Sequence, residues 1–353
     1  MLIEAGLVKE DGVQASSRKG RNPIRLKLDS DAYHILSIDL GGTNLRGAVL
    51  NLNGELLHRL SDTTRSADFE DQIVQLVTRL IRTEPQARFL GIGVGAAGTV
   101  EQPSGRILNM PALKRQSVEL THVLGREFAL PILVDNDVNY AALGEWWHGA
   151  AQQKENVICI SIGTGIGSGL ILGGQLYRGS HNLVGEIGYF FHAEKLPGKP
   201  YQAFGAMEMR AGGWGIRHRA LQRLKEGAHS ILSADAITGL GAKAILEASL
   251  QGDTLARDIV RDAAFEIGVA AANVISLLDL DRVVLMGGIM GTPQEIIPVV
   301  EEAIRTVAVP EARNKVDVCL GKLGDDAVLI GAAYQVQETL LPAAILGVQS
   351  EGH

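Results

Sequence analysis

Cysteine is scarce in this chain of 353 residues, and long uninterrupted apolar runs are absent. Cys159 and Cys319 lie far apart inside apolar runs, so we expect two reduced core residues of a cytoplasmic protein. No apolar run approaches the ~20 residues of a membrane helix, and no secretory signal opens the chain. These features argue against both a disulfide-rich secreted protein and a membrane-spanning one.

Charged residues are also few, at 21% of the chain against 46% hydrophobic residues, a balance typical of a well-packed globular protein. The net charge of −7 disfavours a broad nucleic-acid surface. The charge is uneven, because residues 1–28 carry +3 and the remainder −10. The length suits two domains of ordinary size.

Glycine, by contrast, is abundant, and two glycine-rich turns are the most informative features. In residues 35–49, ILSIDLGGTNLRGAV, two apolar runs flank a GGTN turn, which predicts a β-hairpin. Its glycines let backbone N–H groups approach an anion, and Asp39 is placed to hold a hydrated divalent cation. A second turn, GTGIGSG at 163–169, also follows an apolar run. Either turn alone would more often be structural, but the pair suggests two half-domains closing on one polyphosphate.

The order of predicted elements points to the same duplication. A pattern of three strands, a helix, a strand and a helix occurs twice, which predicts two related α/β lobes. The predicted strands are 34–39, 45–50, 55–61, 89–94, 132–134, three from 156 onward, 282–286 and 316–320. The predicted helices are 68–83, 118–128, 139–149, several within 208–278, 294–307 and 327–340. We place the lobes at 31–150 and 151–341, between an opening segment 1–30 and a tail 342–353.

With these elements in order, residues 32–340 resemble the ROK family (repressors, open reading frames and sugar kinases), which has the actin-like ATPase, ribonuclease H-like fold. DLGGTN and GTGIGSG are similar to the family's two phosphate motifs, and Gly287-Gly288 to its adenosine contact. The resemblance implies that ATP binds with Mg²⁺, held by Asp39 through water. The implied ATP and phosphate contacts are Asp39, Gly41, Gly42, Thr43, Asn44, Gly163, Thr164, Gly165, Gly167, Gly287 and Gly288.

Four further segments are similar to the family's sugar site: LNMP at 108–111, VDNDVNYAALGE at 134–145, VGEIG at 184–188 and AMEMRAGG at 206–213. The implied sugar ligands are Asn109, Asn136, Asp137, Glu186, Glu208 and Tyr189. Clustered carboxylates and amides suit a sugar, whose hydroxyls both donate and accept. The alternatives are a solvated surface position for Glu186 and a favourable helix-dipole position for Glu208.

Asp137 is the candidate general base. Phosphoryl transfer needs a base near the acceptor hydroxyl, and a carboxylate between a buried strand and a helix is suitably placed. The alternative is that Asp137 only caps the helix that begins at Val138. Asp135 has no role in the family and fits a capping role better.

The chain departs from the family pattern in two places. Many members have a histidine after GEIG and then a cysteine-rich loop that holds zinc. Here Tyr189 takes the histidine position and the following loop has no cysteine, so His192 alone cannot form a tetrahedral site and we expect no zinc. His181 and His218 are expected to be ordinary surface residues.

The second departure is the opening segment, residues 1–28, which resembles the last helix and wing of the winged helix-turn-helix of the family's repressors, with RKGRNP at the tip. A recognition helix is missing, so we expect no tight sequence-specific DNA binding by this chain. A shortened repressor-type member, or a start codon assigned too far downstream, would give this sequence; a solvated basic strand pair is the alternative.

Three functions remain open from the sequence. The first is an ATP-dependent kinase for a hexose or related sugar, because both phosphate motifs and Asp137 are intact. The second is a sugar-responsive transcriptional regulator with a truncated DNA-binding domain. The third is a sugar-binding module without catalysis. We expect a homodimer or larger homo-oligomer, with a small-molecule sugar as partner.

Overall fold

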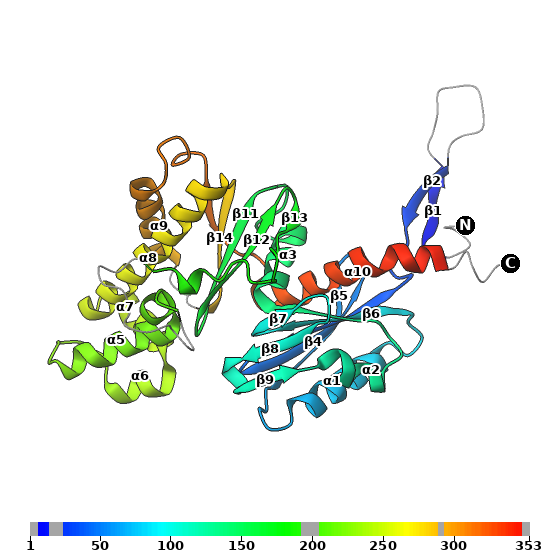
Figure 1. The fold of residues 1–353 in the computed structure, drawn as a ribbon, viewed down its shortest axis with the longest axis horizontal. Helices are drawn as coiled ribbons and strands as arrows, with labels where there is room; N and C mark the ends of the chain where they lie inside the picture. Colours follow the sequence, from blue (N-terminus) through cyan, green and yellow to red (C-terminus); the bar gives the residue numbers. More distant parts are fainter. Residues whose placement is uncertain (1–5, 14–23, 192–204, 289–292, 348–353) are drawn as a thin grey trace. The chain divides into compact units, whose positions relative to one another are not determined.

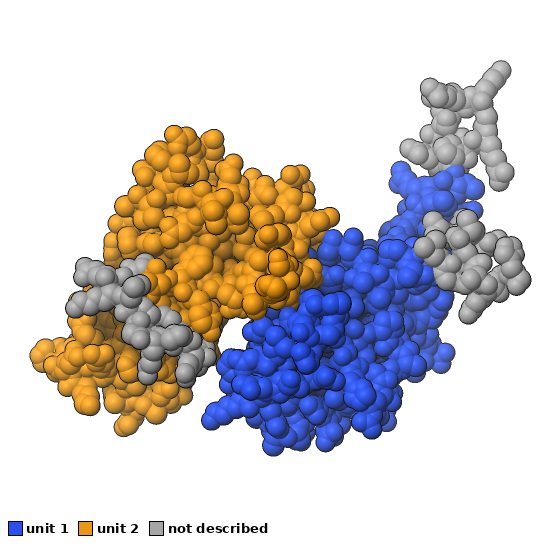
Figure 2. Space-filling view, in the orientation of Figure 1, with its two compact units in different colours: residues 1–144, 328–353 blue, residues 145–327 orange. Residues whose placement is uncertain are grey.

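The computed structural model describes residues 6–13, 24–191, 205–288 and 293–347. The chain forms two compact units (Figure 2): residues 1–144 with 328–353 make unit 1, and residues 145–327 make unit 2. Each unit is built on a five-stranded sheet.

The sheet of unit 1 has the strand order β5-β4-β3-β6-β10. β3 and β4 form the predicted antiparallel hairpin, β5 pairs antiparallel with β4, and β6 and β10 extend the sheet in parallel. β3 is buried along its whole length, including its polar residues His34, Ser37 and Asp39, as expected for the central strand of a sheet covered on both faces. The strands are β3 (His34–Leu40), β4 (Asn44–Asn51), β5 (Leu56–Thr63), β6 (Phe89–Ala96) and β10 (Ile132–Asn136).

Helices α1 (Phe69–Thr83) and α2 (Leu120–Glu127) cover one face of this sheet, and α10 (Ala327–Gly347) lies on the other (Figure 1). The buried face of α1 has helical spacing, which is the periodicity that predicted it. Its buried apolar residues are Phe69, Ile73, Leu76, Val77 and Leu80.

Alternate glycines of β6 make room for α10. A Cβ on Gly91 would lie 2.7 Å from Leu340, one on Gly93 2.9 Å from the Ala332 oxygen, and one on Gly95 2.5 Å from Val328. These glycines share one face of β6, because side chains alternate along a strand. The helix therefore lies directly on the strand backbone. It also continues through Pro342 to Gly347, beyond the predicted end at Leu340.

A small three-stranded sheet was not predicted. It has the order β7-β8-β9, with β7 (Thr99–Glu101), β8 (Arg106–Met110) and β9 (Arg115–Val118), and a 3-10 turn at Pro111–Leu113. These strands are too short for a periodic pattern and are stabilised by pairing with one another. The predicted helix at 118–128 therefore begins later, at Leu120.

The sheet of unit 2 repeats the same topology, in the order β13-β12-β11-β14-β15. An antiparallel hairpin of β11 and β12 lies beside the parallel strands β14 and β15. The strands are β11 (Val157–Ile162), β12 (Ile166–Leu172), β13 (Gln175–Leu176), β14 (Arg282–Met286) and β15 (Asp317–Leu320). The matching order confirms two related α/β lobes.

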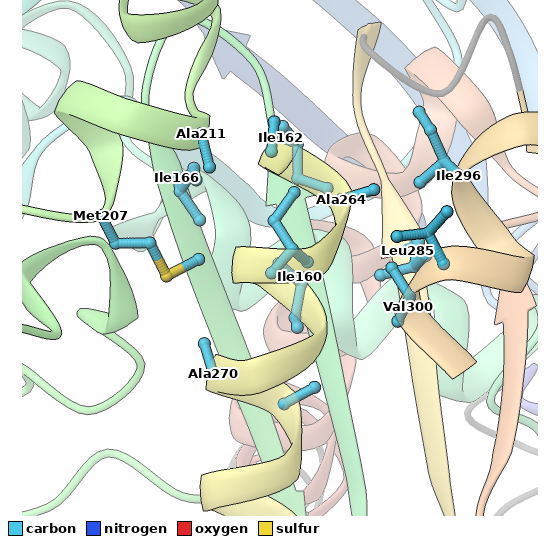
Figure 3. Close-up of a cluster of buried hydrophobic side chains, with 14 of the residues drawn as sticks. Ile160, Ile162, Ile166, Met207, Ala211, Ala264, Ala270, Leu285, Ile296 and Val300 are labelled. Carbon is cyan, nitrogen blue, oxygen red and sulfur yellow. The ribbon is translucent and has the colours of Figure 1, made fainter. Parts of the chain in front are cut away.

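The other helices of unit 2 pack on the long helix α8 (Thr254–Leu278) or on one another. They are α4 (Glu208–Ala211), α5 (Gly213–Lys225), α6 (Ala234–Leu240), α7 (Ala242–Leu250) and α9 (Pro293–Val307), with 3-10 turns at Ile187–Tyr189 and Gly324–Asp326. Figure 3 shows the apolar core of this unit, where Ala264 and Ala270 of α8 lie among isoleucines from β11 and β12. A Cβ on Gly268 would lie 2.8 Å from the Val300 oxygen, so α8 and α9 pack closely.

The remaining elements are a ribbon and a connecting helix. β1 (Val8–Val13) pairs antiparallel with β2 (Ile24–Leu28), and the predicted RKGRNP tip lies outside the described residues. α3 (Asp137–His148) leaves β10 in unit 1 and ends in unit 2. None of the helices in the described part of the chain is both long and apolar enough to cross a membrane.

The division into units differs from the predicted lobes in two respects. The change falls at Glu145 instead of near Ala150, and the last helix belongs to unit 1 instead of the second lobe. The physical reason for the latter is the contact of α10 with the glycines of β6.

Candidate functional site

The GGTN turn joins β3 to β4 in unit 1, as predicted. The Gly41 N–H donates to the Asn44 oxygen at 3.0 Å, and Thr64 holds the turn through its N–H to the Thr43 oxygen and its hydroxyl to the Gly41 oxygen. A Cβ on Gly42 would overlap that of Ala112. Thr43 and Asn44 are exposed, so their polar groups are accessible to a ligand.

Asp39, the predicted magnesium residue, is almost fully buried and forms an ion pair. The Arg46 Nη1 donates to Asp39 Oδ2 at 2.9 Å, and the two residues face each other directly on β3 and β4. The side chain of Asp39 is 8% exposed and that of Arg46 is 19% exposed, so water screens this ion pair only weakly. The guanidinium therefore fixes the orientation of the Asp39 carboxylate.

Asp39 and Asp137 lie at the same edge of the sheet. Gly95 on β6, the strand between β3 and β10, pairs with Asp39 on one side and with Asp135 on the other, and Asp137 follows Asp135 two residues later. A Cβ on Gly95 would be 3.4 Å from the Asp137 Cα. The carboxyl ends of parallel strands thus bring the two predicted carboxylates to one edge, where α/β proteins bind ligands.

Asn136 provides the helix cap that the sequence offered as the alternative role of Asp137. Its Oδ1 accepts hydrogen bonds from the N–H groups of Val138 at 2.9 Å and Asn139 at 3.2 Å, the pattern of an N-cap residue. The Val138 N–H also donates to Asp137 Oδ1 at 3.0 Å, so Asp137 shares one of these two donors with Asn136. The buried Asp135 accepts from the Asn136 N–H and the Asn139 amide and fixes the geometry of the cap.

Gly98 connects the two predicted amide ligands. The Asn136 amide donates to the Gly98 oxygen at 3.0 Å, and a Cβ on Gly98 would overlap the Asn109 carbonyl. Asn109, on β8, is half-buried. The unpredicted small sheet therefore places Asn109 beside Asn136 within unit 1.

The second glycine turn joins β11 to β12 in unit 2. The Gly163 N–H donates to the Gly165 oxygen at 3.0 Å, while the Gly163 and Thr164 oxygens accept from the first N–H groups of α5. Gly167 lies within β12, paired with Ser161. A Cβ on Gly287 would overlap the Ile162 oxygen, so the predicted adenosine contact lies against this turn. Gly288 is exposed.

Glu186 is presented by a loop that requires glycine. Gly185 has φ +92, and a Cβ there would overlap the oxygen of Ser168. The Ser168 N–H and hydroxyl both donate to the Gly185 oxygen at 2.9 Å, which fastens the loop to β12. The Glu186 side chain reaches solvent, yet surrounding protein atoms raise its pKa by desolvation and Glu208 raises it further.

Glu208 holds this region together from the other side. Its Oε1 accepts from the Ile166 N–H and its Oε2 from the Gly205 N–H, both at 2.9 Å. Tyr189 is 46% exposed; desolvation raises the pKa of its phenol, and the charges of Glu208 and Glu186 raise it further. Three predicted sugar ligands thus form one electrostatically coupled group within unit 2.

Sequence reasoning missed the role of Glu145, the last residue of the VDNDVNYAALGE segment. It is 1% exposed and accepts from the N–H groups of Ala150, Lys322 and Leu323. The signal available was a Glu inside an otherwise apolar helix, close to Gly149. It fastens the end of α3 to the strand-end loop of β15 in unit 2.

Within the described ranges, no three His, Cys, Asp or Glu side chains gather into a group that could hold a metal ion. His192 and the cysteine-free loop up to residue 204 lie outside those ranges, and the absence of zinc stays a prediction. His218 lies on the exposed face of α5, and His181 is also exposed.

Comparison with known proteins gives the family. The sequence profile described as ROK family matches residues 35–339. A glucokinase of Halalkalibacterium halodurans is 29% identical over 321 residues, covering 88% of this chain and 96% of that protein.

Two solved structures share the fold. A ROK family transcriptional regulator, a homolog of the E. coli MLC protein, has a TM-score of 0.85 at 26% identity and covers 99% of this chain and 89% of its own. A ROK family glucokinase from Streptomyces griseus, in complex with glucose and AMPPNP, has a TM-score of 0.72 at 28% identity. The match covers 86% of this chain and 99% of the glucokinase chain. The family match spans most of the chain, and this protein belongs to the ROK family, which includes both sugar kinases and transcriptional regulators.

Proposed function

We propose that this protein is an ATP-dependent sugar kinase that phosphorylates a hydroxyl of a hexose or related sugar, with Asp137 as general base. The observation that supports this most is the capping of α3 by Asn136. Because Asn136 Oδ1 accepts from the N–H groups of Val138 and Asn139, the second and third residues of α3, a carboxylate at position 137 is not needed to cap the helix. An acidic group beside an existing cap suits a proton acceptor.

The other residues take roles that follow from their positions. The exposed GGTN turn and the Gly163 turn would bind the phosphates of ATP through backbone N–H groups and Thr43. Mg²⁺, when bound, neutralises phosphate oxygens, and Asp39 would hold it through water. The residues proposed to bind sugar hydroxyls are Asn109, Asn136, Glu186, Glu208 and Tyr189.

In the transfer step, the acceptor hydroxyl attacks the γ-phosphorus and the bond to the β–γ bridging oxygen breaks. The hydroxyl proton goes to the Asp137 carboxylate, and ADP leaves with the bridging oxygen. The protein contributes position and electrostatic stabilisation, which is most of the catalysis in phosphoryl transfer.

The test is Asp137→Asn with a coupled ADP-release assay across aldohexoses, N-acetylhexosamines and fructose. Turnover should fall by ~10²-fold or more with sugar affinity nearly unchanged, because the amide keeps the size but cannot accept the proton. Glu247→Gln is the matched control: it makes the same carboxylate-to-amide change at a side chain that is 49% exposed, and turnover should stay unchanged. Asn136→Ala tests the cap separately and should lower the free energy of unfolding by ~1 kcal/mol. Equal kcat in Asp137→Asn would remove the base assignment.

A sugar-responsive regulator is the second candidate, favoured by the coverage of the comparisons. The regulator structure covers 99% of this chain, including the β1–β2 ribbon, whereas the glucokinase structure covers 86%. Sugar binding without ADP release from any sugar of the panel would decide for the regulator.

A further inference from the structure

Trp214 lies at the second residue of α5, directly beside the Gly163 turn. Its backbone N–H donates to the Thr164 oxygen at 3.1 Å, and the Gly213 N–H donates to the Gly163 oxygen at 2.9 Å. A Cβ on Gly213 would lie 2.6 Å from that same oxygen, so the start of the helix contacts the turn without intervening side chains. The backbone of Trp214 is therefore fixed relative to the turn.

The indole ring is both exposed and supported. Trp214 is 39% exposed, and its ring stacks on His218, one helical turn later, with centroids 5.0 Å apart and planes inclined by 6°. Residues four apart lie on the same face of a helix, so the imidazole limits rotation of the indole. A single exposed aromatic residue is ordinary on a protein surface. Trp214 differs from such a residue because its ring is stacked on His218 and its backbone is hydrogen-bonded to the turn for which we propose phosphate binding.

We propose that Trp214 is the stacking platform for the purine base of the nucleotide whose phosphates the Gly163 turn binds. This inference rests on the proposed function and adds the residue that recognises the base. Gly287 contacts the Ile162 oxygen at the start of the same turn, so Trp214 and the Gly287-Gly288 turn both adjoin residues 162–164 within unit 2. The turn would take the phosphates, and the flat apolar surface beside it would take the base.

Stacking on Trp214 is expected to increase the affinity for a nucleotide with little discrimination between bases. Stacking on an aromatic ring tolerates any base, since every base has a π-face, and removal of such a ring typically weakens binding by ~10-fold or more. ATP and GTP should therefore bind with similar affinity. Inorganic tripolyphosphate, which has no base, should gain nothing from Trp214.

Calorimetric titrations of the full chain with Mg²⁺ and either ATP or tripolyphosphate test this. Trp214→Leu keeps an apolar side chain without the ring, and Trp214→Phe keeps a ring. In Trp214→Leu the Kd for ATP should rise by ~10-fold while that for tripolyphosphate stays within about twofold, and Trp214→Phe should lie close to the parent. Trp147→Phe is the matched control, because Trp147 also contacts a neighbouring histidine, His148.

Three outcomes would overturn the proposal: unchanged ATP affinity in Trp214→Leu, an equal loss for ATP and tripolyphosphate, or a loss of sugar affinity instead of ATP affinity. The binding measurement does not depend on turnover. A chain that binds ATP through Trp214 but transfers no phosphate would refute the kinase and retain the platform, and a chain that binds no nucleotide would refute both.

Discussion

Glu145 offers the sharpest test of how unit 2 is held together. Its carboxylate is 1% exposed and accepts three backbone hydrogen bonds. Oε2 accepts from Ala150 at 2.7 Å and Lys322 at 3.0 Å, and Oε1 accepts from Leu323 at 2.9 Å. The perturbation is Glu145→Gln, which preserves the size of the side chain and replaces one oxygen by an amino group.

The magnitude follows from these three bonds. If the amide oxygen takes the Oε2 position, it still accepts from Ala150 and Lys322, but these hydrogen bonds are weaker because the group is uncharged. The NH₂ group then faces the Leu323 N–H, and two donors without an acceptor lie opposite each other. A hydrogen bond to a charged group is worth ~1.5–3 kcal/mol, so we expect unit 2 to lose about 3 kcal/mol. Glu145→Ala leaves three N–H groups without this acceptor, each at ~1–3 kcal/mol, and should lose about 5 kcal/mol or more.

Hydrogen exchange by mass spectrometry is the suitable assay, because it reports local opening without assuming that both units unfold together. The amide hydrogens of Ala150, Lys322 and Leu323 should exchange faster in Glu145→Gln than in the parent. The midpoint of unfolding of the variant should also be lower than that of the parent. The control is Glu247→Gln, whose side chain is 49% exposed and pairs only at 3.8 Å with Lys243; it should change stability by under ~0.5 kcal/mol. Unchanged exchange and an unchanged midpoint in Glu145→Gln would show that these three hydrogen bonds do not stabilise unit 2.

Further expectations concern the site itself. Arg46→Met removes a charged hydrogen bond to the nearly buried Asp39 and should lower the free energy of unfolding, measured by urea titration, by about 2 kcal/mol. Arg46→Lys keeps the charge and should lower it by less. An equal decrease in both variants would contradict the paired geometry of Arg46 and Asp39. Gly185→Ala should destabilise the protein by at least ~2 kcal/mol, because φ at Gly185 is +92 and the added Cβ would overlap the Ser168 oxygen; calorimetry should then detect no sugar binding. The control is Gly239→Ala, which has open space around it and should be neutral or stabilising. A neutral effect of Gly185→Ala would show that the loop adapts to the added Cβ. Because the pKa of Glu186 is raised, the folded state binds the carboxyl proton more tightly than the unfolded state, and the parent loses stability as the pH rises through that pKa. Glu186→Gln should therefore be more stable than the parent at neutral pH, and the difference should vanish in acid. A stability difference that does not depend on pH would contradict the raised pKa of Glu186. Metal analysis of purified protein should find no stoichiometric zinc, and one zinc per chain that resists dialysis would show that the cysteine-free loop was misinterpreted.

Elements with strong local signals could be predicted from the amino-acid sequence alone. The GGTN hairpin, α1 and the buried strands follow from apolar periodicity and turn chemistry, which act over a few neighbouring residues. The repeated element order also determined the two related lobes, because topology leaves few ways to arrange such a series. The family motifs within that order supplied the candidate ligands.

The contacts between residues far apart in the sequence became clear only from the fold. It gave the cap of α3 to Asn136, placed Asn109 beside it through Gly98, and assigned α10 to unit 1 through the glycines of β6. It also showed that Glu145 fastens a loop 177 residues away in sequence, and that Arg46 holds Asp39. These outcomes depend on which backbone groups approach each other across strands, a property that no local pattern of residues encodes.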